Sequence, residues 1–186
     1  MNTAYTSKEL LVKLSKKYKK DKLAEKFINE KMKKQYMKYH PAKPEFNHLK
    51  SVVKIISKFT DNKDAIIAAW LHDAVEDKYI TYEQIKEYFG EKVVYLVYEL
   101  TSDKTVVEII GKAEYLINKL NNMTNEALLI KLADRLDNVS DLEVADPGFR
   151  KYYKTQTLNV LKNIHRTFQP EHITIMGKIH EKLSKV

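Results

Sequence analysis

The stretch that most constrains the fold is residues 65–71, which read Ala-Ile-Ile-Ala-Ala-Trp-Leu. A helix of this composition is apolar on nearly every side, so it must lie in the interior with other elements packed around it. Asp61 and Asn62 precede it and are suited to cap its N-terminus. The sequence therefore predicts a central buried helix that the rest of the chain encloses.

The rest of the chain is also expected to be helical. The 186 residues include only four glycines and four prolines, and scarce helix breakers beside abundant Lys, Glu, Leu and Ile favour an all-α fold. The length and the 44% hydrophobic content allow one substantial core. We expect a single domain over 1–186, with Lys-rich N-terminal helices at 1–43, a core at about 44–145 and C-terminal helices at 146–186.

Helical periodicity and capping residues give approximate bounds for the helices. Two helices, or one with a break, are expected over 7–37. The prolines at 41 and 44 make 38–47 the longest loop, and His48 stands in the first turn of the helix that follows. Lys104 is expected in a turn. The remaining helices are expected at about 81–90, 93–100, 109–120, 124–138, 149–168 and 170–184.

The absence of cysteine excludes disulfides, Cys-ligated zinc and thiol catalysis. No apolar run approaches the roughly 18 residues of a membrane span, and the N-terminus has no signal-type apolar core. We expect a soluble, cytoplasmic protein without membrane contact. Of the net charge of +8, residues 1–43 supply 13 lysines against 4 acidic residues. Such a face would attract nucleic acid, but a solvated surface is the favoured interpretation.

The central helix ends in a cluster of ionisable residues: His72, Asp73, Glu76 and Asp77. If the helix continues, Asp73 lies beside Glu76 and Asp77, because residues three and four apart share a face. Carboxylates that close repel one another unless a proton or a cation lies between them. A divalent metal is the simplest explanation.

Two distant residues complete this set. His48 begins one core helix, and Asp134 lies at the polar edge of another. Each alone is more often a core or capping residue. Combined with His72 and Asp73, they form a mixed nitrogen and oxygen set that suits manganese, iron or zinc and leaves coordination positions open for water and substrate.

These residues resemble the H…HD…D signature of the HD-domain metal-dependent phosphohydrolases. His-Asp-Ala-Val-Glu-Asp at 72–77 and Lys-Leu-Ala-Asp-Arg-Leu-Asp-Asn at 131–138 are similar to motifs in the hydrolase domain of RelA/SpoT homologues, which remove the 3′-pyrophosphate of (p)ppGpp. The resemblance covers roughly residues 35–145. It implies a compact multi-helix HD fold with a central metal-binding helix, and a small alarmone hydrolase that acts on a nucleotide.

The resemblance also implies roles for single residues. The implied metal ligands are His48, His72, Asp73 and Asp134. Manganese is the family's usual ion. Glu76 and Asp77 would orient the attacking water, accept its proton or return it to the leaving group. Lys38 and Lys104 would contact phosphate, Tyr39 would stack on a purine, and Asn138 would face the nucleoside.

The chain departs from the family at the substrate end. Met37-Lys38 stands where the family commonly has Arg-Lys, Asp137 occupies a position that is usually not acidic, and Ser140-Asp141 replaces a frequent Arg-Thr. An extra negative charge and a lost guanidinium weaken the case for a doubly pyrophosphorylated guanosine but leave the metal centre intact. The alternatives are an HD-domain phosphatase for another nucleotide and a catalytically idle HD-fold binding module. The native metal, the base preference and the oligomeric state are not fixed by the sequence.

Overall fold

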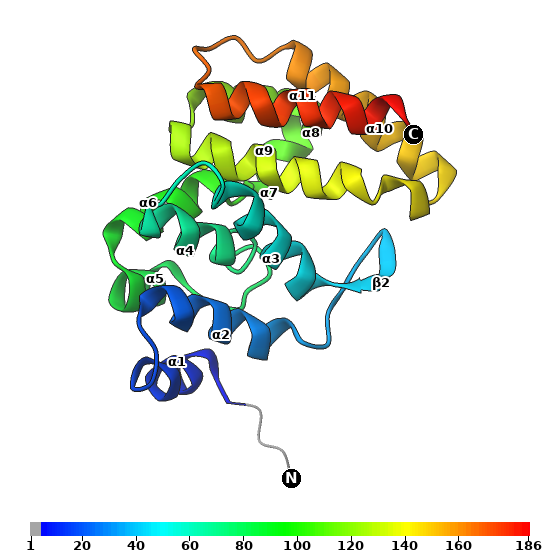
Figure 1. Cartoon of the computed structure of the whole chain (residues 1–186). Helices are drawn as coiled ribbons and strands as arrows, with labels where there is room; N and C mark the ends of the chain where they lie inside the picture. Colours follow the sequence, from blue (N-terminus) through cyan, green and yellow to red (C-terminus); the bar gives the residue numbers. More distant parts are fainter. Residues whose placement is uncertain (1–4) are drawn as a thin grey trace.

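The computed structural model describes residues 5–186, and the regular secondary structure of this part of the chain is helical except for one small two-stranded sheet (Figure 1). The prediction of an all-α fold is therefore confirmed. The elements in chain order are α1 (Ser7–Ser15), α2 (Lys20–Met32), β1 (Tyr36–Met37), β2 (His40–Pro44), α3 (Glu45–Ile56), α4 (Lys63–Leu71), α5 (Tyr82–Phe89), α6 (Glu91–Leu100), α7 (Lys104–Ile110), α8 (Lys112–Asn122), α9 (Asn125–Ser140), the 3-10 turn η1 (Leu142–Val144), α10 (Pro147–Lys162) and α11 (Pro170–Ser184).

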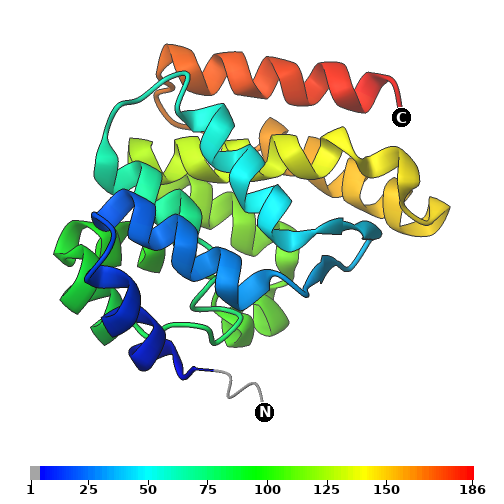
Figure 2. The ribbon, with the colours of Figure 1, turned by 60° about the horizontal axis from the view of Figure 1, so that its bottom comes forward.

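Helix α4 is the central buried helix that its composition predicts. Asn62 caps it by accepting hydrogen bonds from the backbone N–H groups of Asp64 and Ala65, and residues 67–71 are all buried. It packs against α2, α3 and α6, and α9 packs against both α3 and α11; Figure 2 shows α3 crossing in front of α9. One hydrophobic cluster extends from Leu10 to Leu183. The N-terminal and C-terminal helices thus pack on the same core.

The segment predicted as a long loop is more ordered than expected. β1 and β2 form an antiparallel hairpin, and α3 begins directly after it at Glu45. Helix α2 ends at Met32, so residues 36–37, predicted as helical, belong to β1. His48 lies in the first turn of α3, as predicted. Lys38 and Tyr39 lie in the turn between β1 and β2. The hairpin projects outward from the start of α3 (Figure 1).

The His72 to Asp77 motif is not helical, which corrects the assumption of a continuing helix. Helix α4 ends at Leu71, and residues 72–78 form successive turns. The carbonyl of Ala69, which a continuing helix would offer to the N–H of Asp73, accepts the imidazole N–H of His72 instead. The turn still brings Asp73 and Asp77 together, because the N–H of Asp77 donates to the carbonyl of Asp73.

Lys104 begins a helix, where the sequence predicted a turn. Asp103 caps α7, and Gly111, with a φ of +82°, separates α7 from α8. A left-handed residue of this kind stops a helix, and glycine adopts it without steric cost. The predicted single helix over 109–120 is therefore two helices. No helix in the described range, 5–186, is long and apolar enough to cross a membrane.

Candidate metal centre and active site

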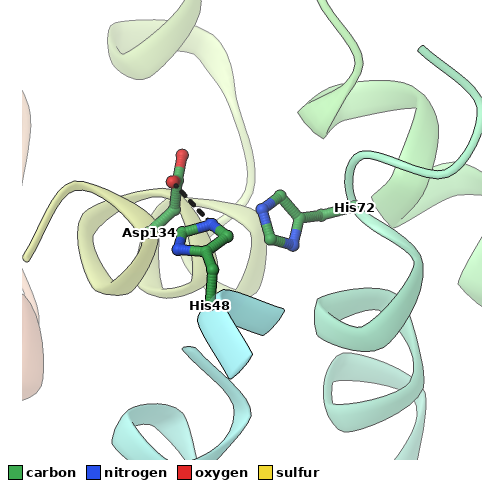
Figure 3. Close-up of side chains that lie close together, drawn as sticks. All are labelled: His48, His72 and Asp134. Atoms are coloured by element: carbon green, nitrogen blue, oxygen red, sulfur yellow. Dashed lines mark ion pairs between the residues drawn. The ribbon is translucent and has the colours of Figure 1, made fainter. Parts of the chain in front are cut away.

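Three of the four predicted metal ligands meet in the interior. His48 comes from the first turn of α3, His72 from the C-cap of α4 and Asp134 from the middle of α9 (Figure 3). All three are buried, and each offers one ligand atom such that these atoms lie within 4.8 Å of one another. Helices far apart in the sequence thus converge on one point.

Both imidazoles have the orientation that metal ligands need. Nδ1 of His48 lies 2.6 Å from Oδ2 of Asp137, and Nδ1 of His72 lies 2.8 Å from the carbonyl oxygen of Ala69. Since these oxygens can only accept, each Nδ1 carries the proton and each Nε2 is left to bind an ion. Nε2 of His72 is buried and makes no hydrogen bond among the described residues, although Oδ2 of Asp73 lies 3.2 Å away. A buried nitrogen without a hydrogen bond, next to a carboxylate, fits a divalent metal site.

Asp73, the fourth predicted ligand, lies beside this group. Its Oδ2 is 3.2 Å from Nε2 of His72, and 32% of its side chain is exposed. Burial raises the pKa of Asp73, but the adjacent imidazole more than offsets this and lowers it to about 2. The carboxylate is therefore ionised at neutral pH. Its role as a ligand stays a prediction.

Asp134 has both carboxylate oxygens engaged. Oδ1 accepts from Nδ2 of Asn138 at 2.6 Å and lies 3.4 Å from Nε2 of His48, while Oδ2 pairs with Nζ of Lys131 at 2.8 Å. Burial raises the pKa of Asp134, yet the charge of Lys131 and the bond to His48 hold it well below its usual range. The Asp134 carboxylate is thus ionised at neutral pH, at the centre of the site.

The two predicted acid/base residues lie at the edge of the site. Oε2 of Glu76 accepts from the backbone N–H of Ser102 at 3.3 Å, and Asp77 is exposed. Burial, Asp73 and Glu76 together raise the pKa of Asp77. Burial and the charges of Asp77 and Asp73 likewise raise the pKa of Glu45, in the first turn of α3. These carboxylates therefore act on one another electrostatically.

The predicted substrate residues fall into two groups. The Tyr39 hydroxyl donates to Oδ1 of Asn138 at 2.8 Å although 99 positions separate them, and the Tyr39 ring stacks on Phe149 with centroids 5.5 Å apart. Lys38 and Lys104 are exposed, and their positive charges oppose the rise in the pKa of Asp77. All four residues thus border the metal ligands or the acid/base pair.

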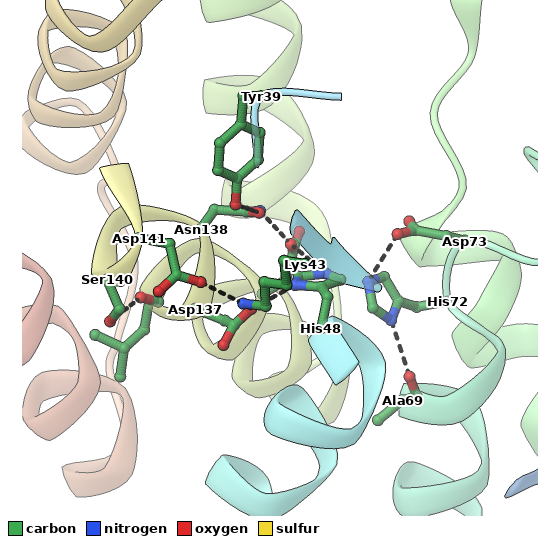
Figure 4. A network of polar contacts seen from close by, with 12 residues as sticks. Tyr39, Lys43, His48, Ala69, His72, Asp73, Asp137, Asn138, Ser140 and Asp141 are labelled. Carbon is green, nitrogen blue, oxygen red and sulfur yellow. Dashed lines mark hydrogen bonds and ion pairs between the residues drawn. The ribbon is translucent and has the colours of Figure 1, made fainter. Parts of the chain in front are cut away.

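Three residues around the predicted ligands had no role predicted from the sequence: Lys43, Lys131 and Asp137. In the sequence, Asp137 was interpreted only as an extra negative charge that disfavours the substrate. In the structure it bonds to His48 and is neutralised by Nζ of Lys43 at 2.6 Å (Figure 4). The signal for Asp137 was its place three residues after Asp134, on the same face of the helix. Lys43 carried no such local signal.

Fold and site together define an all-helical protein with a buried site for a divalent metal, built from two histidines and an aspartate. A family model described as HD domain matches residues 22–164, and the chain belongs to this HD-domain family. Membership implies a divalent metal, and His48, His72 and Asp134 form a group that could hold one.

The chain is similar to several proteins named guanosine-3′,5′-bis(diphosphate) 3′-pyrophosphohydrolase. It is 37% identical to MESH1 of Xenopus tropicalis over 123 residues, which are 65% of this chain and 68% of that protein. It is 39% identical to MESH1 of Drosophila melanogaster over 107 residues, 56% of this chain and 59% of that protein. With the protein from Aquifex aeolicus it shares 35% identity over 63% of its length, but covers only 17% of that longer protein.

A solved structure is similar over most of the chain. It is described as a metazoan ortholog of SpoT that hydrolyzes ppGpp and plays a role in starvation responses. The TM-score is 0.75 at 28% identity, over 88% of this chain and 95% of the other. The similarity therefore extends over most of the fold.

Proposed function

We propose that this chain is a metal-dependent (p)ppGpp 3′-pyrophosphohydrolase, with manganese as its ion. The observation that carries the proposal is the buried cluster of His48, His72 and Asp134, whose ligand atoms lie within 4.8 Å of one another. The names of the relatives at 37% and 39% identity support the substrate. Nitrogen and carboxylate ligands together suit a first-row divalent ion.

The proposed reaction is hydrolysis at the 3′ position. An oxygen–phosphorus bond forms between water and the phosphorus attached to the 3′ oxygen, and the bond from that phosphorus to the 3′ oxygen breaks. Pyrophosphate leaves and the 3′ hydroxyl regains a proton, so ppGpp yields GDP. When bound, a divalent ion supplies Lewis acidity for the water and for the phosphoryl oxygens.

The chain's own acid/base groups handle the protons. Asp77 is suited to hold a proton and return it to the 3′ oxygen, because burial and the charges of Asp73 and Glu76 raise its pKa. Glu76, fixed by the N–H of Ser102, orients the attacking water and accepts its proton. Asp73, ionised and next to His72, serves as the fourth ligand.

Residues of the hairpin and of α7 and α9 bind the substrate. Lys38 and Lys104, whose charges act on Asp77, attract the phosphates. Asn138 faces the nucleoside. A purine that stacks on Tyr39 uses the ring face opposite Phe149, because Phe149 covers the other face.

Product analysis tests the proposal. Purified protein is incubated with ppGpp and Mn²⁺, Mg²⁺, Zn²⁺ or Co²⁺ in parallel, and GDP, pyrophosphate and orthophosphate are quantified. We expect GDP and pyrophosphate in equal amounts, with Mn²⁺ most effective. Asp134→Asn should abolish turnover, whereas Asp61→Asn, the same change at an exposed aspartate, should not. Orthophosphate from other nucleotides with none of these products from ppGpp would assign the chain to a different HD phosphatase.

A further inference from the structure

A short polar chain links the hairpin to a metal ligand. Nζ of Lys43, in β2, lies 2.6 Å from Oδ2 of Asp137, and the same oxygen lies 2.6 Å from Nδ1 of His48 (Figure 4). Asp137 is 6% exposed and His48 2% exposed. Buried charged groups at these distances hold one another in a fixed geometry.

We propose that Asp137 is a positioning residue for the metal centre: its carboxylate fixes the tautomer and ring orientation of His48, so that Nε2 is presented to the divalent ion. Lys43 neutralises this carboxylate and so connects the substrate-binding hairpin to the metal ligand. The inference rests on the proposed function, since it concerns the same metal.

The two histidines differ in what orients them. Nδ1 of His72 donates to a neutral carbonyl, that of Ala69, whereas Nδ1 of His48 donates to a carboxylate. A carboxylate acceptor makes an imidazole a stronger electron donor to a metal than a carbonyl does. His48 is therefore the ligand whose strength depends most on its partner.

The charge of Asp137 is balanced by its neighbours. A buried carboxylate without a cation is unfavourable by several kcal/mol, and Lys43 supplies that cation, its own side chain being only 14% exposed. Nζ of Lys43 also lies 2.5 Å from Oδ2 of Asp141, the C-cap residue of α9. Asp141 touches Lys43 without bonding to His48, which makes it a matched control.

A second link runs parallel to the first. The hydroxyl of Tyr39 donates to Asn138, and Nδ2 of Asn138 donates to Oδ1 of Asp134 at 2.6 Å. Adjacent residues of α9, Asp137 and Asn138, thus each join the hairpin to a different metal ligand. Because of this arrangement, the hairpin and the ligands are expected to hold their positions together.

Metal binding without substrate tests the inference. Co²⁺ is titrated into the wild-type protein, Asp137→Asn and Asp141→Asn, and its visible absorption is followed at about pH 8.5, where protons compete less for the ligands. We expect Asp137→Asn to weaken Co²⁺ binding about 10- to 100-fold and to change the spectrum. Asp141→Asn should stay within about threefold of wild type.

A measurement on the wild-type protein covers the case in which Asp137→Asn does not fold. Nitrogen-15 NMR of the Zn²⁺-loaded protein should show His48 with a protonated Nδ1 and a metal-bound Nε2. A deprotonated Nδ1, wild-type Co²⁺ affinity in Asp137→Asn, or an equal loss in Asp141→Asn would each overturn the inference alone. If the wild-type protein binds neither ion, the proposed function fails with it.

Discussion

Loading a divalent metal should displace a proton from His48. Burial lowers the pKa of this imidazole, but its bonds to Asp134 and Asp137 outweigh burial and raise the pKa to about 10 in the metal-free protein. At neutral pH the ring is therefore protonated, and Nε2 must lose its proton to bind a metal. The gap of about three pH units costs about 4 kcal/mol of binding free energy at about pH 7.

The raised pKa of His48 determines how metal affinity depends on pH. Because protonated His48 excludes the metal, apparent affinity should rise about tenfold for each pH unit, or about a hundredfold between about pH 6 and about pH 8. Without a bound metal, the contribution of His48 to folding stability should instead fall as the pH rises. Its folded-state pKa of about 10 exceeds the ordinary 6.5, so the stability that His48 contributes is complete below about pH 6.5 and lost as pH rises through about 10.

Isothermal titration calorimetry with Mn²⁺ measures the displaced proton. Titrations at one pH in buffers of different ionisation enthalpy should give release of at least one proton per ion bound. His180→Gln, at an exposed histidine of α11, should release the same number. Zero protons released at about pH 7, or an affinity that does not change between about pH 6 and about pH 8, would refute the reasoning.

Three further predictions concern catalysis, substrate binding and the core. Glu76→Gln should lower kcat about 10²- to 10⁴-fold in steady-state assays, because the general base is lost, while Co²⁺ affinity stays near wild type. Tyr39→Phe removes the bond to Asn138 and should raise KM a few-fold, on the order of one lost hydrogen bond, with kcat little changed. Trp70→Ala removes a buried ring that stacks on Phe46 and should lower the free energy of unfolding by about 3–5 kcal/mol in urea titrations.

Specific outcomes would contradict these three predictions. Loss of Co²⁺ binding in Glu76→Gln would make Glu76 a ligand or a structural residue. An unchanged KM in Tyr39→Phe would remove the tyrosine hydroxyl from the organisation of the substrate site. Tyr95→Ala, a truncation of an exposed aromatic side chain, is the control for Trp70→Ala, and an equal loss of stability in both would mean that burial does not account for the effect.

Local sequence signals determined much of the helical framework. The apolar composition of residues 65–71 indicated a central helix, and Asn62 caps it as its position predicted. The helices expected from 81 and from 124 are capped by Thr81 and Thr124. These features depend on neighbours within four residues, so periodicity and capping patterns contain them. The types of the predicted metal-binding side chains were visible for a similar reason, since they interrupt apolar helical patterns.

Two helix boundaries predicted from the sequence were wrong, because a side-chain hydrogen bond there overrides the helical pattern. A helix was assumed to continue through Asp77, but the His72 side chain takes the Ala69 carbonyl and the chain turns. Lys104 was expected in a turn, yet Asp103 caps a helix that begins there. In both cases one side-chain hydrogen bond decides a helix boundary, and periodicity does not report such bonds.

The sequence by itself determined that this protein has a helical core with a metal-type set of histidines and aspartates. Only the tertiary structure decided that Asp137 bonds to both Lys43 and His48, and that Tyr39 meets Asn138 across 99 positions. The physical reason is the range of the interactions. Caps and helix faces are fixed within a turn of the chain, whereas these contacts exist only after α3, α9 and the hairpin have packed together.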